Sequence, residues 1–154
     1  MRRSTRMVVV VLFVVGVLGT ACVTNPVGPV TTAGGYREKA SSTIEAVLGS
    51  VETARIVGEA EIEGKTFTAF THQVVDDAFG PVRTAQDTFE TVAPPDDEAR
   101  QLQPKVLDAL ERSRRSLVAV ATALDSTNLD AISRAVDQLR PCAEELRALH
   151  EQLQ

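Results

Sequence analysis

Cysteine and histidine are the side chains of this sequence best suited to nucleophilic, acid–base or metal chemistry, and there are four of them: Cys22, His72, Cys142 and His150. Catalysis or metal binding needs such groups at spacings that bring several together. Neither histidine has a partner at a ligand spacing, and the Glu-x-x-His motif of di-iron bundles does not occur. We therefore predict no catalytic, metal or cofactor site, with His72 at the surface or a helix cap and His150 partly exposed.

Charged residues form the next set of candidates. The acidic runs lack the glycine and terminal glutamate of a calcium-binding loop, so we interpret them as solvated helix faces. The one basic cluster after the N-terminus, Arg112, Arg114 and Arg115, has Asp108 and Glu111 within a helical turn. Residues three or four apart on a helix are neighbours, which predicts ion pairs there and not an anion site.

The first 22 residues follow a distinctive order. Three arginines within six residues precede an apolar run of 12 residues from Met7 to Leu18, and the small residues 19–21 lead to Cys22. This order is typical of a signal peptide. The run is shorter than the roughly 20 residues that span a membrane as a helix. An uncleaved membrane anchor and an ordinary secretion signal stay open as alternatives.

The segment Leu18-Gly19-Thr20-Ala21-Cys22 resembles the lipobox of bacterial lipoproteins. The resemblance covers residues 1–22 and departs from the family at Gly19, where leucine or a similar residue is preferred. It implies that Cys22 receives a diacylglyceryl group on its sulphur and becomes the first residue of the mature protein, and that Cys142 is then an unpaired thiol. It also implies attachment to the cell membrane on the extracytoplasmic side, in the periplasm or at the cell surface.

The charge of the chain is distributed unevenly. From Cys22 onward there are 13 Lys or Arg and 21 Asp or Glu residues, a formal charge of −8. Such a surface repels phosphate backbones, and the clustered basic face of a nucleic-acid-binding protein is missing, so we expect no nucleic-acid partner. The lack of tryptophan and the single tyrosine also argue against an aromatic protein-binding hot spot.

The sequence divides into a signal peptide (1–21), a lipidated N-terminus with a flexible linker (22–35) and a helical domain (36–154). Residues 23–35 contain two prolines, three glycines and no charge, as flexible linkers do. From Tyr36 onward apolar residues recur at three- and four-residue steps, which predicts α-helices. Four such segments with short connections favour an all-α fold, an antiparallel bundle of about four helices.

The predicted helices are separated by breaks near Gly64, Pro94-Pro95 and Ser126-Thr127. The first runs from about 37 to 63, although Glu63-Gly64-Lys65 leaves a β-hairpin open as an alternative. In the second, Pro81 predicts a kink near Ala78. Its predicted core stripe is Phe67, Phe70, Val74, Ala78, Val82, Ala85, Phe89 and Val92.

The last two segments have the most regular stripes. Cys142 lies on the apolar side of the fourth, so we expect an inert buried thiol. The third stripe is Leu102, Val106, Leu110, Leu117, Val120 and Leu124, and the fourth is Leu129, Ile132, Val136, Leu139, Ala143, Leu146, His150 and Leu153.

Three functions are compatible with these features. The first is a membrane-anchored, non-catalytic helical module that binds a protein or cell-envelope partner. The second is a carrier that holds a small apolar ligand between its helices. The third, an envelope enzyme, would need convergent polar groups that the sequence does not indicate. The sequence does not indicate an oligomeric state.

Overall fold

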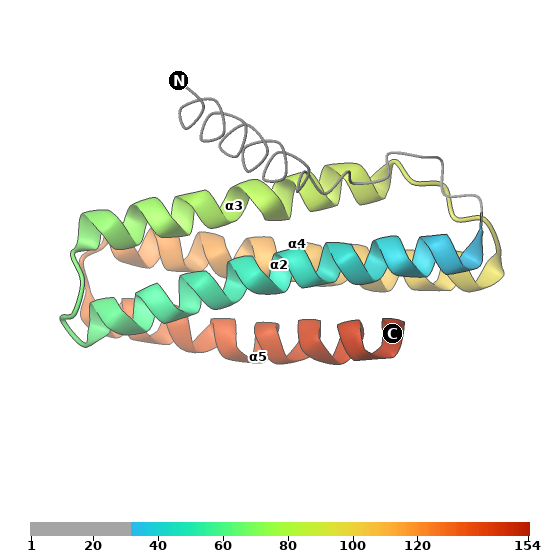
Figure 1. The fold of residues 1–154 in the computed structure, drawn as a ribbon. Helices are drawn as coiled ribbons and strands as arrows, with labels where there is room; N and C mark the ends of the chain where they lie inside the picture. The colour runs from blue at the N-terminus through green and yellow to red at the C-terminus, as the bar shows by residue number, and fades with distance from the viewer. Residues whose placement is uncertain (1–31) are drawn as a thin grey trace, which may run out of the picture.

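Residues 32–154 are described by a computed structural model, and this part of the chain is all-α. Its four helices are α2 (Ala33–Ile62), α3 (Thr68–Glu90), α4 (Asp97–Asp125) and α5 (Leu129–Leu153). Each helix runs antiparallel to the next and packs against it, and α5 closes the bundle by packing on α2 (Figure 1). The predicted antiparallel bundle is confirmed. The predicted signal peptide and Cys22 lie outside the described residues.

The connection between α2 and α3 is a helix stop and not a hairpin. Gly64 adopts a φ of +66°, the left-handed conformation that glycine reaches without steric cost. The Gly64 N–H donates to the Glu61 carbonyl at 2.9 Å, and the Lys65 N–H donates to the Ala60 carbonyl at 2.8 Å. This pair of bonds is a Schellman motif, which satisfies carbonyls that the helix end would otherwise leave open.

The other breaks also fall where they were predicted, because polar side chains cap the helices that follow. The Asp96 carboxylate accepts the Ala99 N–H at 2.8 Å at the start of α4. The Asn128 side chain accepts the Ala131 N–H at 3.1 Å at the start of α5. Each bond satisfies an N–H group that has no partner within the helix, which sets the first residue of the helix.

Helix α2 begins at Ala33, before the predicted start at about residue 37, so the last residues of the predicted linker are helical. The Thr32 hydroxyl accepts the Gly35 N–H at 3.1 Å, and this cap offsets the low helix propensity of Gly34 and Gly35. Helix α3 runs without a break through Pro81, so this proline, for which a kink near Ala78 was predicted, does not end the helix.

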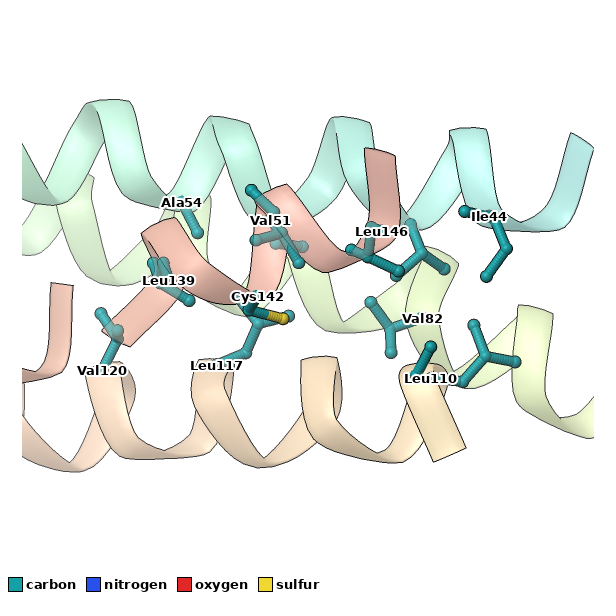
Figure 2. Packing of buried hydrophobic residues seen from close by; sticks show 14 of the residues in the cluster. Ile44, Val51, Ala54, Val82, Leu110, Leu117, Val120, Leu139, Cys142 and Leu146 are labelled. Carbon is teal, nitrogen blue, oxygen red and sulfur yellow. The ribbon is translucent and has the colours of Figure 1, made fainter. Parts of the chain in front are cut away.

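All four helices contribute side chains to one continuous apolar core. Figure 2 shows side chains such as Val51, Leu117 and Leu146 converging from different helices into the bundle interior. The predicted stripe on α4 is buried except for Leu102, which is partly buried. On α2 the apolar residues at three- and four-residue steps are also buried except for the partly buried Leu48: Ile44, Val47, Val51 and Ala54. The pattern therefore predicts the core well along the middle of each helix.

The predictions for Phe67, Phe70 and Leu129 are wrong, because these side chains are 83%, 56% and 59% exposed. Phe67 precedes α3 in an extended conformation, so it does not lie on the helix face that its spacing suggests. In the first turns of α3, Thr71 and Val75 face the core instead. Helix periodicity alone does not show which of two neighbouring stripes faces the core, and the buried stripe of α3 begins at Thr71 and not at Phe70.

Candidate functional site

Cys142 is buried, as predicted, and is unpaired within residues 32–154. Figure 2 places its sulphur among apolar side chains in the bundle interior. The sulphur lies 3.5 Å from the Ser113 hydroxyl, and that hydroxyl also donates to the Ala109 carbonyl at 2.8 Å. A thiol becomes nucleophilic when a base or cation favours its thiolate. Since a serine hydroxyl is neither, the site fits a packing role for Cys142.

His150 and Ser41 come together across α5 and α2 although 109 positions separate them, a contact that sequence analysis did not predict. The His150 Nδ1 lies 3.2 Å from both the hydroxyl and the backbone carbonyl of Ser41. On the other side of the ring, the Gln154 amide nitrogen is 2.8 Å from Nε2. The His150 ring therefore lies between Ser41 on α2 and Gln154 at the end of the chain.

The contact joins the first part of α2 to the end of α5. His150 is half-buried, which agrees with its predicted place on a helix seam near the chain end.

His72 is half-buried in the second turn of α3. Its Nε2 lies 3.8 Å from a carboxylate oxygen of Asp125, the last residue of α4. This contact joins the ends of two helices on the side of the bundle where α2 turns into α3. Within residues 32–154, no group of three or more His, Cys, Asp or Glu side chains could hold a metal ion.

Ion pairs join α2 to α5 around a shallow depression of about 200 Å³. The Arg55 guanidinium donates to Glu52 at 2.8 Å and to Glu59 at 2.6 Å along α2. From α5, Arg147 pairs with Glu52, and Arg140 lies 3.7 Å from Glu59. Because three guanidinium groups share two carboxylates, the network links the two helices and carries a formal charge of +1.

The predicted pairing of the basic cluster on α4 is confirmed. Arg114 donates to Glu111 through two nitrogens, both at 2.8 Å, and this bond lowers the pKa of Glu111 below its ordinary value. Arg115 lies 3.6 Å from the same carboxylate. Arg112 contacts Asp108 at 2.9 Å and reaches Glu145 on α5 at 2.5 Å. These three arginines therefore all form ion pairs at the surface.

A second depression, of about 140 Å³, lies where α2 and α4 begin, beside the Arg37–Glu98 ion pair. It is smaller than the roughly 300 Å³ at which pockets for small molecules usually begin. Tyr36 lines it, but the ring is fully buried and packs on Phe89 with centroids 5.3 Å apart. Desolvation raises the pKa of Tyr36, whose hydroxyl has no partner within the described residues.

These observations define the described part as an all-α antiparallel four-helix bundle. Several of the polar contacts between its helices are ion pairs between an arginine and a carboxylate. No protein-family model matches the chain, and neither do the curated proteins or solved structures with which it was compared. Within residues 32–154, no helix is both long enough and apolar enough to cross a membrane.

Proposed function

We propose that the chain is a precursor of a lipoprotein, held at the extracytoplasmic face of a membrane by lipid on Cys22, whose helical bundle binds a protein or cell-envelope partner without catalysis. The observation that carries the proposal is the basic start, the 12-residue apolar run and the small residues before Cys22. Thiol chemistry is what distinguishes this position, because the sulphur would accept the diacylglyceryl group.

The physics of lipid anchoring supports this use of Cys22. Each buried CH₂ contributes about 0.8 kcal/mol, and one acyl chain alone holds a protein only reversibly. Two or more chains on one residue therefore make a lasting anchor. The described bundle begins at Thr32, ten positions after Cys22, so that a short segment would join the lipid to a folded domain.

The test replaces Cys22 with serine, which keeps the size and polarity but removes the sulphur. In the wild type, mass spectrometry of protein extracted from membranes should show a first peptide that begins at Cys22 and carries at least two acyl chains. In Cys22→Ser, unprocessed precursor should accumulate at higher mass. The Cys142→Ser variant is the matched control, and its N-terminal peptide should keep the acyl chains.

Two results would count against the anchor. A wild-type chain that begins at Met1 would make residues 7–18 part of an uncleaved membrane segment. An unmodified N-terminus near residue 22 would make them an ordinary secretion signal. Either result would show that Cys22 does not carry the lipid anchor.

A further inference from the structure

Three exposed apolar side chains belong to one end of the bundle, the end where α2 turns into α3 and α4 turns into α5 (Figure 1). We call residues 61–72 and 125–130 the tip. Of the five large apolar side chains that are exposed within residues 32–154, the three in the tip are Phe67, Phe70 and Leu129. Single exposed apolar residues are ordinary, but two exposed phenylalanines three positions apart are not.

The tip is held in shape by hydrogen bonds, so its phenylalanines are exposed on an ordered surface. The Glu61 carboxylate at the end of α2 accepts hydrogen bonds from the Thr68 hydroxyl at 2.5 Å and the Thr71 hydroxyl at 2.9 Å. The Phe70 N–H donates to the Phe67 carbonyl at 2.8 Å. Because the backbone of the tip is already ordered, binding there loses less conformational entropy than binding by an unstructured loop.

The charge around these side chains is negative. The tip contains four carboxylates, on Glu61, Glu63, Asp125 and Asp130, and one lysine, Lys65. The lysine is already paired with Glu63 at 2.5 Å. Complementary potentials favour association and like charges oppose it. The surface therefore favours a partner with cationic side chains and disfavours a second copy of the same tip.

The position of the tip argues against a lipid surface as its ligand. The chain enters the bundle at the opposite end, and the 30 residues of α2 place the tip about 45 Å away from that entry at 1.5 Å per residue. A bundle tethered through Cys22 can present the tip away from the membrane. The carboxylates of the tip also repel anionic headgroups.

We propose that the tip docks a protein partner that receives Phe67 and Phe70 in an apolar pocket bordered by lysine or arginine side chains. Aromatic side chains at the centre and polar groups at the rim are the usual anatomy of a protein interface. Phe67 and Phe70 would supply the aromatic contact against which the lack of tryptophan and the single tyrosine had argued. The proposal rests on the partner-binding function proposed above and assigns that function to one end of the molecule.

The test uses the full chain in the cells that make it, with the photoreactive residue p-benzoylphenylalanine placed at position 67 or at position 70. Irradiation should join the protein to a peptide of a different protein that contains both apolar and Lys or Arg residues. The same probe at Val118, an apolar residue 41% exposed on the side of α4, is the matched control and should give at least tenfold less product.

The role of charge is tested with the probe kept at position 67. Glu63→Lys and Asp130→Lys should together lower the yield of crosslinked product several-fold, because both residues are exposed and their replacement opposes a cationic rim. The double variant should stay folded and unfold within several degrees of the parent, because both residues are exposed and the main cost is the loss of the Asp130 carboxylate from the first turn of α5.

Crosslinks to lipid, to a second copy of this chain or to an acidic peptide would overturn the proposal, as would no product at positions 67 and 70. Products from position 118 alone would overturn the tip as the docking site. They would still support the partner-binding function, with the partner bound at another surface. The N-terminal mass of the same sample reports on the anchor separately, so loss of the lipid on Cys22 is distinguishable from loss of the docking surface.

Discussion

At the scale of single residues, Gly58 is a position where α2 approaches α5 closely. A Cβ atom at Gly58 would lie 2.5 Å from a methyl carbon of Val136, closer than real Cβ contacts. Gly49, on the same helix, has open space around the corresponding position. The two glycines therefore differ in what an added methyl group would meet, although both lie inside a helix.

We predict opposite signs for the two alanine variants. Gly58→Ala should destabilise the bundle by up to about 2 kcal/mol, because overpacking costs roughly 1–3 kcal/mol and the gain in helix propensity offsets about 1 kcal/mol of it. Gly49→Ala should stabilise it by about 1 kcal/mol, the difference in helix propensity. Chemical denaturation followed by circular dichroism measures both values. Equal changes in the two variants would contradict the close approach of α2 and α5.

At the scale of the elements, the connection between α4 and α5 contains a strained residue. Thr127 has a φ of +51°, in the left-handed region that β-branched side chains rarely adopt. It follows the end of α4, where its N–H donates to the Leu124 carbonyl at 3.0 Å. The equivalent position after α2 is occupied by Gly64, which adopts this conformation without strain.

Thr127→Gly should therefore stabilise the protein by about 1 kcal/mol, because the left-handed conformation costs a residue with a side chain roughly 1–2 kcal/mol and glycine almost nothing. Thr122→Gly, at an exposed position inside α4, is the control and should destabilise the protein, since glycine lowers helix propensity there. Thermal unfolding of the two variants provides the comparison. A loss of stability in Thr127→Gly would show that the Thr127 side chain makes a contribution larger than its strain.

At the scale of the whole molecule, the described bundle contains one core to which all four helices contribute. We predict that a fragment of residues 32–154 folds cooperatively without the N-terminal segment. Two different signals can follow the unfolding of this fragment. Circular dichroism reports on all four helices. The fluorescence of Tyr36, the single tyrosine in a chain without tryptophan, reports on the buried start of α2.

Both probes should give the same unfolding midpoint, because a small single-core domain usually unfolds in one transition. The full chain, measured in detergent, is the control for any contribution of residues 1–31. If the Tyr36 signal changed at a lower temperature than the helical signal, the start of α2 would be a separate unit that frays before the rest of the bundle.

The sequence by itself determined the class of fold, the number of helices after residue 31 and the places where they end. These features depend on local physics: apolar residues three and four apart mark a helix, and Gly64, Asp96 and Asn128 supply the bonds that stop or start one. The N-terminal pattern that motivates the proposal for Cys22 is also local, since it depends on the order of residues within one short segment.

The tertiary structure alone decided which side chains meet between helices and which are left uncovered. Ser41 and His150 are neighbours, and Gly58 touches Val136, because of how the helices are rotated and aligned along one another. Phe67 continues the spacing of a core stripe and is nevertheless exposed. A stripe buries a residue only if another helix faces it, and the way each helix is rotated against its neighbours is not encoded within one turn of the chain.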